Sequence, residues 1–206
     1  AVIPVERYTG APEMMDGRVK TLHPRVHGGI LGDRDRHAAE ALQHDIPWID
    51  VVVVNLYPFE AATAAGADWN EAIENIDVGG PTMLRAAAKN HRNVTVVVDP
   101  GDYDRVGAAL LAGGTGPDLR RELAIRAFRH TARYDAVIGA WLAEAAGIGA
   151  EFPSELAFGL RKVQALRYGE NPHQQAAFYG DTGQGARNLS RLVQHQGKEL
   201  SFNNLG

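Results

Sequence analysis

The chain has 206 residues, of which 45% are hydrophobic and 22% charged, and it carries a net charge of −4 at pH 7 with no cysteine. This composition is ordinary for a globular protein, and it excludes disulfides, thiolate metal sites and the broad basic excess of nucleic-acid-binding proteins. Residues 1–10 contain no signal peptide and no apolar run approaches the ~20 residues that span a bilayer, so we expect a cytoplasmic protein that binds neither nucleic acid nor membrane.

Two β-branched runs, at residues 49–54 and 93–98, predict strands that are buried on both faces. Between them, residues 69–76 and 81–89 are predicted to be helical, the second with proline at a favourable first-turn position. Strand, helices and strand follow one another as in a βαβ unit. We therefore predict an α/β fold with an open, mostly parallel sheet and flanking helices.

A long helix is predicted over residues 118–146, with room for one break. Its apolar side chains recur at three- and four-residue steps, and most of its arginines fall off that stripe. Gly147 and Gly149 are expected to end the helix, and residues 113–117, which are rich in glycine, are expected to form a surface turn before it.

The composition changes after the long helix. Glycines and a proline punctuate the next segment, and a short strand is expected at residues 176–179. We predict a first domain over residues 1–150, a linker over 151–165 and the incomplete beginning of a second domain over 166–206, which is too short to fold alone. Because the chain starts without methionine and stops without a closing element, we expect a fragment at both ends.

The first candidate ligand site is the segment GRVKTLHP at residues 17–24. Arg18 and Lys20 supply positive charge and Thr21 adds a hydroxyl donor, a set that suits a ligand with a phosphate or a carboxamide. An ordinary basic surface turn is the alternative.

A metal site is not predicted in this segment. His23 and His27 are four residues apart, a spacing that can bind a metal ion on a helix. Pro24 between them argues against a regular helix there, and no acidic third ligand is evident.

A second candidate follows the first predicted strand, at the sequence NLYPF of residues 55–59. Ligands of open α/β sheets bind beyond the carboxyl ends of the strands, which is where Asn55 and Tyr57 are expected. The alternative is that Tyr57 and Phe59 are aromatic residues of the core or of a turn.

The helix predicted over residues 81–89 has a candidate at each end. Gly79 and Gly80 at its start allow backbone amides to approach a ligand, and the neighbouring Asp77 can orient an amine or accept a proton, or simply cap the helix. Lys89 follows three alanines, and a crowded lysine can carry protons; a cation that favours the helix C-terminus is the alternative.

A further candidate is the sequence RYGENPHQ at residues 167–174. Arg167 and Tyr168 can clamp a phosphate or stack on a flat base, and a plain polar loop is the alternative.

Five motifs in one order carry a resemblance to a known family. They are PEMMDGRVKTLHP at 12–24, NLYPF at 55–59, IDVGG at 76–80, RAAAKN at 85–90 and LRYGENPHQ at 166–174. Together they closely resemble the bifunctional phosphoribosylaminoimidazolecarboxamide formyltransferase / inosine monophosphate (IMP) cyclohydrolase. The resemblance implies a methylglyoxal-synthase-like domain that closes the purine ring of the formamido ribonucleotide to give IMP, with loss of water and no cofactor. It also implies a cytidine-deaminase-like domain that transfers a formyl group from 10-formyltetrahydrofolate.

The resemblance also implies roles for individual residues. Lys20, Tyr57, Asp77 and Lys89 are implied as catalytic, with Lys89 the leading proton donor and acceptor. Substrate binding is implied for Arg18, Val19, Thr21, Asn55, Val78 and Gly79 in the cyclohydrolase, and for Arg167 and Tyr168 in the formyltransferase. A helix that starts at Gly80 puts Lys89 roughly 13 Å up its axis, so either the helix is short or bent, or Gly79 and Lys89 meet different ends of the substrate.

The family further implies a homodimer that binds a purine ribonucleotide. The catalytic Lys-His pair of its formyltransferase is expected beyond residue 206, so the isolated chain is expected to lack formyltransferase activity. Part of the phosphate-binding loop of its cyclohydrolase is expected before residue 1, so the isolated chain is expected to be weak or inactive as a cyclohydrolase. Two alternatives stay open: a methylglyoxal-synthase-like phosphate lyase and a non-catalytic nucleotide-binding module.

Overall fold

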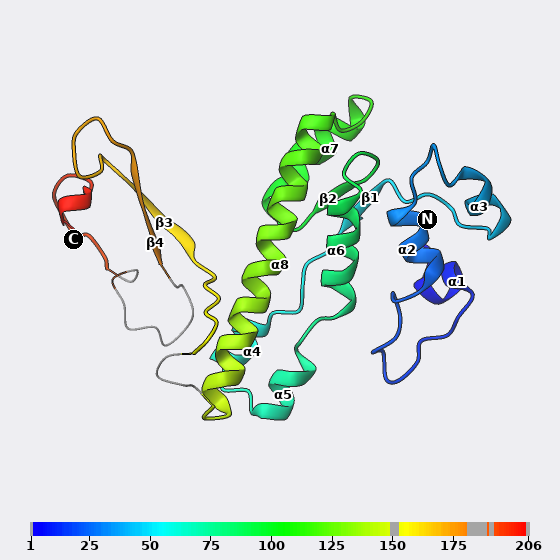
Figure 1. Ribbon diagram of the computed structural model, residues 1–206, viewed down its shortest axis with the longest axis horizontal. Helices are drawn as coiled ribbons and strands as arrows, with labels where there is room; N and C mark the ends of the chain where they lie inside the picture. The colour runs from blue at the N-terminus through cyan, green and yellow to red at the C-terminus, as the bar shows by residue number, and fades with distance from the viewer. Residues whose placement is uncertain (1, 149–152, 181–188, 190–191, 205–206) are drawn as a thin grey trace. The chain divides into compact units, whose positions relative to one another are not determined.

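The structure is a computed structural model that describes residues 2–148, 153–180, 189 and 192–204. The chain forms two compact units (Figure 1). Unit 1 comprises Ala1–Tyr57 and Glu74–Ala132, and unit 2 comprises Pro58–Ile73 and Arg133–Gly206. The domain boundaries expected from the sequence stay a prediction.

The centre of unit 1 is a short parallel sheet. Strands β1 (Val51–Val53) and β2 (Thr95–Val97) pair in parallel, with Val52 opposite Val96. Flanking backbone hydrogen bonds, such as that from the Val54 N–H to the Val97 carbonyl at 3.1 Å, extend the ladder beyond both strands. The two β-branched runs therefore form the predicted strands, and the predicted βαβ order is confirmed. Burial on both faces holds for β2 but was wrong for β1, where Val53 is 51% exposed.

Helix α6 (Gly79–Lys89) is the last helix before β2 and supplies much of the core. Its small and apolar residues face inward, whereas Thr82, Arg85 and Lys89 are exposed. The side chains that are almost wholly inaccessible in this core are Ile30, Leu84, Ala87, Ala88, Val94, Val96, Val97, Leu123 and Ala127. Burial of this apolar surface is the main force that holds α6 against the sheet.

Helix α2 (Pro24–Leu31) packs against α6. The Asn90 amide at the end of α6 donates hydrogen bonds to the carbonyls of Ile30 and Gly32, at 2.7 and 3.0 Å, and so satisfies the last turn of α2. Position 29 requires glycine, because a Cβ there would lie 2.5 Å from the Pro47 carbonyl oxygen. The position of α2 along α6 is thus fixed at its C-terminal end.

The expectation that Pro24 prevents a regular helix was wrong. Pro24 is the first residue of α2, where the N–H that proline lacks has no intrahelical partner in any case. His23 lies just before the helix as its N-cap, and its Nδ1 accepts a hydrogen bond of 3.1 Å from the Arg25 N–H. Within the described ranges there is no group of three or more His, Asp or Glu placed to hold a metal ion.

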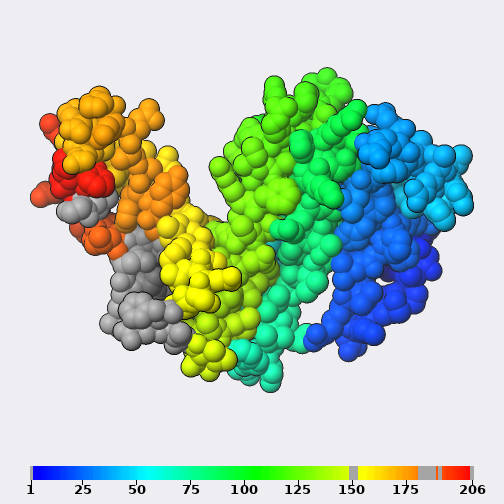
Figure 2. Space-filling view, in the orientation of Figure 1, coloured from blue at the N-terminus to red at the C-terminus, as the bar shows by residue number. Residues whose placement is uncertain are grey.

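Several short helices complete unit 1. Helices α1 (Val5–Thr9), α2 and α3 (Ala38–Gln43) form the blue surface in Figure 2. After β2, the 3-10 helix η1 (Pro100–Asp102) leads into α7 (Tyr103–Leu111). Helices α1, α3 and α7 were not predicted.

Helix α8 (Pro117–Ala145) runs for 29 residues without the break that the sequence allowed. Gly113 and Gly114 before it have φ values of 110° and 125°, and Gly147 after it has a φ of 64°, conformations that glycine adopts without strain. The predicted turn and the predicted helix are therefore confirmed, whereas Gly149 lies outside the described residues. No helix in the described part of the chain has both the length and the apolar character needed to cross a membrane.

Unit 2 is built on the last turns of α8. Trp141 makes an edge-to-face contact with Phe59 of α4 (Phe59–Ala64) at 5.7 Å and stacks on Trp69 of α5 (Trp69–Glu74) at 6.0 Å between ring centroids. Arg133 forms a bidentate ion pair with Glu60, at 2.5 and 2.6 Å.

Strands β3 (Arg161–Leu166) and β4 (Ala176–Gly180) pair antiparallel in unit 2, and η3 (Phe202–Asn204) follows. The strand predicted at residues 176–179 is confirmed. Strand β3 begins inside the segment predicted as a linker, and a short apolar and basic stretch such as RKVQAL gave no alternation to reveal it.

Candidate functional site

The N-terminal end of α6 gathers two segments that are far apart in the sequence. Thr21 contacts Gly79 so closely that a Cβ on residue 79 would lie 2.6 Å from the Thr21 hydroxyl oxygen. A Cβ on residue 80 would lie 2.6 Å from Oδ2 of Asp77. The two glycines are therefore required by close approach at this end of the helix, with Thr21 on one side and Asp77 on the other.

Asp77 links α6 to the loop that follows β1. Its Oδ1 accepts a hydrogen bond of 2.7 Å from the Gly80 N–H, and its Oδ2 accepts a longer one of 3.4 Å from the Tyr57 N–H. The first bond satisfies one of the free donors of the helix start, which is the capping role that the sequence left open. The second brings Tyr57 to the same end of the helix.

The basic segment forms a tight loop with an isolated bridge between Met14 and Val19. Met15, Asp16 and Gly17 at its tip all have positive φ values. Val19 is half-buried and takes part through its backbone, with hydrogen bonds to Met14 of 3.1 and 3.2 Å. The loop thus presents the neighbouring cations on either side of Val19.

Both cations of this loop are paired with carboxylates. Lys20 Nζ donates a hydrogen bond of 2.7 Å to Glu13, and Arg18 forms an ion pair with Glu74. The hydrogen bond and charge of Glu13 raise the pKa of Lys20 above its ordinary value, and Tyr57 contributes in the same direction. Lys20 therefore stays protonated and positively charged at neutral pH, and it interacts electrostatically with Tyr57.

The carboxyl ends of the two strands meet through a side-chain hydrogen bond. Asn55, after β1, donates from its amide to the hydroxyl of Tyr103, after β2, at 3.0 Å. Tyr103 was missed from the sequence. The available signal was its place just after the second predicted strand, because neighbouring parallel strands end at the same edge of a sheet.

The remaining residue at this end of α6 is Val78, which precedes the helix as its N-cap and is largely exposed. Tyr57 is also exposed, with 58% of its surface accessible. The structure thus groups three of the four predicted catalytic residues, Lys20, Tyr57 and Asp77, with Thr21, Val78 and Gly79 of the predicted binding set around the start of α6.

Lys89 is not part of this group. It is the last residue of α6, ten residues after Gly79, which places it about 15 Å along the helix axis. The alanines before it are buried, but Lys89 itself is exposed and lines a groove with His27 and Arg85. Because α6 is a continuous helix of 11 residues, the possibility of a short helix is removed.

Arg167 and Tyr168 lie together in unit 2, just after β3. The Arg167 guanidinium stacks over the Tyr168 ring, 5.2 Å from its centroid, and its Nε donates to the Glu199 carbonyl. The Phe202 N–H donates to the Tyr168 carbonyl at 3.2 Å. The pair is therefore held by the segment around residues 199–202, which no sequence pattern indicated.

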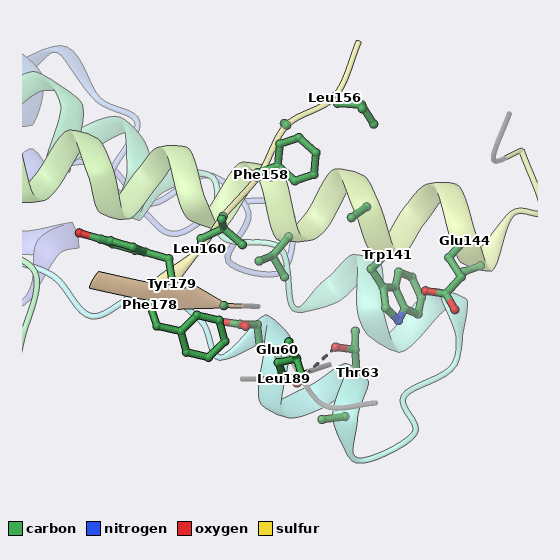
Figure 3. Close-up of a pocket in the computed structure, with 18 residues that line it drawn as sticks. Glu60, Thr63, Trp141, Glu144, Leu156, Phe158, Leu160, Phe178, Tyr179 and Leu189 are labelled. Carbon is green, nitrogen blue, oxygen red and sulfur yellow. Dashed lines mark hydrogen bonds between the residues drawn. The ribbon is translucent and has the colours of Figure 1, made fainter. Parts of the chain in front are cut away.

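Unit 2 also contains an apolar hollow of about 1020 Å³ (Figure 3). Phe158, Leu160, Phe178 and Tyr179 face it from the segment before β3 and from β4, and Trp141 faces it from α8. None of the predicted site residues lines this hollow.

A small parallel sheet with flanking helices is the architecture of a methylglyoxal-synthase-like (MGS-like) domain, and residues 1–82 match the family model described as "MGS-like domain". Residues 87–206 match the model described as "AICARFT/IMPCHase bienzyme". That match covers more than half of the chain, and the chain belongs to the AICARFT/IMPCHase bienzyme family. The predicted family and the methylglyoxal-synthase-like fold are confirmed.

Similar proteins agree with this assignment. The chain is 54% identical to the "Bifunctional purine biosynthesis protein PurH" of Caulobacter vibrioides over 98% of its own length and 38% of that protein's length. It is 53% identical to the protein of the same name from Rhodospirillum rubrum, over 99% of its own length and 39% of that protein's. The chain therefore spans less than two-fifths of these relatives.

A solved structure described as "Crystal structure of ForH" is also similar. It superposes with a TM-score of 0.57 at 39% sequence identity, over 69% of this chain and 74% of that chain.

Proposed function

We propose that the residues at the N-terminal end of α6 bind a purine ribonucleotide and serve the IMP cyclohydrolase reaction. In this reaction the carboxamide nitrogen of the formamido imidazole ribonucleotide attacks the formyl carbon, and the formyl oxygen leaves as water. The proposal rests on one observation: Lys20, Tyr57 and Asp77, from three separate motifs, lie around the same glycine-rich helix start.

The ligand is recognised by several donors in this proposal. The Arg18 and Lys20 cations and the Thr21 hydroxyl suit an anionic or carbonyl-bearing ligand. At the start of α6 the Gly80 N–H is donated to Asp77 and Pro81 has no N–H, so the backbone donor that this helix end adds is the Gly79 N–H, next to the Thr21 hydroxyl. Asn55, together with Val78 and Val19, completes the predicted binding set.

The chemistry needs positioning and charge stabilisation rather than a cofactor. An amide nitrogen is a poor nucleophile, so holding it against the formyl carbon removes much of the barrier. The formyl oxygen gains negative charge in the transition state, and a lasting cation such as Lys20 stabilises that charge. Asp77 and Tyr57 are the groups of the cluster that can accept and donate the protons of the reaction.

Lys89 stays in the proposal as the proton donor and acceptor implied by the resemblance. Its place at the far end of α6 means that it meets a different part of the ligand from Gly79. The substitution Lys89→Ala tests the role: loss of turnover with IMP affinity nearly kept supports catalysis, and unchanged turnover removes Lys89 from the mechanism.

We also propose that unit 2 contributes to a second reaction, a formyl transfer, in the full-length protein. Arg167 and Tyr168 would bind the ribonucleotide substrate of a formyl transfer from 10-formyltetrahydrofolate, at the start of a cytidine-deaminase-like domain. A cytoplasmic homodimer is part of the same proposal.

The test is ultraviolet spectroscopy of the full-length protein with the formamido ribonucleotide, alongside calorimetric titration with IMP, because the isolated chain is expected to be weak or inactive. We expect a new hypoxanthine-like absorbance, and a loss of kcat/KM of about 10²-fold or more in both Lys20→Met and Asp77→Asn. Arg36→Gln, which changes an exposed cation of another loop, is the matched control and should behave as the wild type. IMP binding without turnover would favour a non-catalytic nucleotide-binding module. The absence of both IMP binding and turnover would refute the proposal.

A further inference from the structure

Tyr103 lies at the edge of the sheet where a ligand of this fold is expected, although none of the predicted motifs contains it. It is the first residue of α7 and follows β2, as Asn55 follows β1. Because β1 and β2 pair in parallel, both residues lie beyond the carboxyl ends of the strands. Asn55 is two residues before Tyr57, so the Cα atoms of these two residues are no more than about 7 Å apart.

The backbone that carries Tyr103 is held by buried and capping contacts. The preceding residue, Asp102, has a side chain that is only 6% accessible and accepts hydrogen bonds of 2.8 and 2.9 Å from Arg126 of α8. Asp99 caps η1 by accepting a hydrogen bond of 2.8 Å from the Gly101 N–H. Tyr103 therefore projects from a fixed part of unit 1, as a residue that positions another side chain must.

The Tyr103 hydroxyl determines which way the Asn55 amide faces. The Nδ2 atom of Asn55 donates a hydrogen bond of 3.0 Å to the Tyr103 hydroxyl oxygen. An asparagine amide has a donor on one side and an acceptor on the other, so this bond directs Oδ1 away from Tyr103. Asn55 is exposed, and no residue in the described ranges donates a hydrogen bond to its Oδ1. The pair thus offers a ligand an acceptor in a fixed orientation.

The carboxamide is the part of the proposed substrate that matches this acceptor. Its nitrogen attacks the formyl carbon and becomes the purine N1, and it carries a hydrogen both before and after ring closure. An amide oxygen accepts a hydrogen bond from such a nitrogen without removing the proton, so its contribution is to orient the nucleophile. A nucleotide with a lone pair at the same place would be repelled by Oδ1.

We propose that Tyr103 is a positioning residue that sets the specificity of the ring-closure site. It holds Asn55 so that Oδ1 accepts a hydrogen bond from the carboxamide N–H of the substrate and from the N1–H of the product. The inference rests on the proposed function. It adds the residue that makes this site select a nucleotide with a donor at the purine N1 over one with an acceptor there.

The experiment measures how two nucleotides inhibit ring closure by the full-length protein. IMP has a hydrogen on the purine N1, whereas purine riboside 5′-monophosphate has a lone pair there, and we expect the lower inhibition constant for IMP. In Tyr103→Phe the amide is free to turn, so the ratio of the two inhibition constants should fall by about threefold or more, as for the loss of one neutral hydrogen bond. Tyr179→Phe makes the same change at an exposed position of β4 and should keep the wild-type ratio.

A second substitution separates orientation of the amide from damage to the fold. Asn55→Asp puts an oxygen at both ends of the group, which then presents an acceptor in either orientation. The double variant Tyr103→Phe with Asn55→Asp should therefore recover the preference for IMP. The added negative charge weakens both nucleotides, but both carry the same phosphate, so their ratio still reports the orientation.

Several outcomes overturn the inference while ring closure by the wild type leaves the proposed function standing. These are a wild-type preference for purine riboside 5′-monophosphate, an unchanged ratio in Tyr103→Phe, an equal change in Tyr179→Phe, and a double variant that does not recover the preference. The absence of ring closure in the wild type would overturn the proposed function, and this inference with it.

Discussion

The Asp77 carboxylate holds the start of α6 through a hydrogen bond of 2.7 Å from the Gly80 N–H to its Oδ1. The same carboxylate fills the space in which residue 80 would carry a side chain. Asp77 is therefore placed by the helix that it caps, and its second oxygen is directed to the loop of Tyr57. Any change that displaces this carboxylate should affect both the helix start and the candidate site.

Gly80→Ala tests that dependence. The new Cβ would lie 2.6 Å from Oδ2 and 2.9 Å from Cγ of Asp77, so the carboxylate must leave its place. We expect the free energy of unfolding to fall by about 1–2 kcal/mol through loss of the cap, as measured by urea denaturation. Gly107→Ala is the matched control: it lies in α7 with nothing within 4 Å of its Cβ, and it should stabilise the chain slightly. Equal stability of Gly80→Ala and the wild type would contradict the prediction.

Thr21 and Gly79 should show energetic coupling. Gly79→Ala places a Cβ 2.6 Å from the Thr21 hydroxyl oxygen and should destabilise the chain, whereas Thr21→Ala removes the group that it meets. The double variant should therefore be more stable than the sum of the two single effects predicts, by roughly 0.5–3 kcal/mol in a double-mutant cycle. Strict additivity would mean that the two residues do not touch.

The buried Asp102 should be required for stability. Its side chain is only 6% accessible and accepts hydrogen bonds of 2.8 and 2.9 Å from Arg126, with Arg105 at 3.1 Å. Asp102→Asn removes the charge of the buried one of the two carboxylates that Arg105 and Arg126 share; the other is Glu122, 3.1 Å from each guanidinium. We expect a loss of about 1–3 kcal/mol in chemical denaturation. Asp118→Asn, at a carboxylate that is 92% accessible, should change the free energy of unfolding by under about 0.5 kcal/mol.

His27 should make folding sensitive to mild acid. Burial lowers the pKa of His27 below 6.5, against a smaller opposing effect of a hydrogen bond with the Thr21 backbone. The unfolded chain then takes up a proton at a higher pH than the folded chain does, so stability is lost as the pH falls from 6.5 through the folded pKa.

The measurement is the free energy of unfolding at several pH values between about 7.5 and 5. In His27→Gln the decline on acidification should be smaller than in the wild type. His173→Gln, at an exposed position of unit 2, is the control and should keep the wild-type slope. An unchanged slope in His27→Gln would show that another group is responsible.

Local patterns predicted the main elements because burial alone determined them. The β-branched runs became β1 and β2, and the apolar stripe after residue 117 became α8. Helix α2 was missed because Pro24 was interpreted as a helix breaker, although the first turn of a helix needs no donor from that position. Strand β3 was missed because its sequence, RKVQAL, gave no alternation to reveal it.

The candidate site was predictable in part. The motif at residues 55–57 follows β1, as expected for a site at the carboxyl end of a parallel strand. The motifs at 18–21 and 77–79 join it through the contact of Thr21 with Gly79 and the hydrogen bond from the Tyr57 N–H to Asp77. Other contacts of the site depend on the tertiary structure, which no local sequence pattern predicts. They are the carboxylate partners of Arg18 and Lys20 and the hydrogen bond from Asn55 to Tyr103. The separate position of Lys89 follows from the length of a continuous helix, which the sequence could not distinguish from a shorter one.

The most direct test of the central claim is a crystal structure of the chain with IMP bound. The account predicts that the nucleotide lies at the N-terminal end of α6, in contact with Lys20, Thr21 and the backbone of Gly79, and with Tyr57 and Asp77 beside its purine ring. An IMP molecule bound elsewhere, with Lys20, Tyr57 and Asp77 all out of contact, would contradict it.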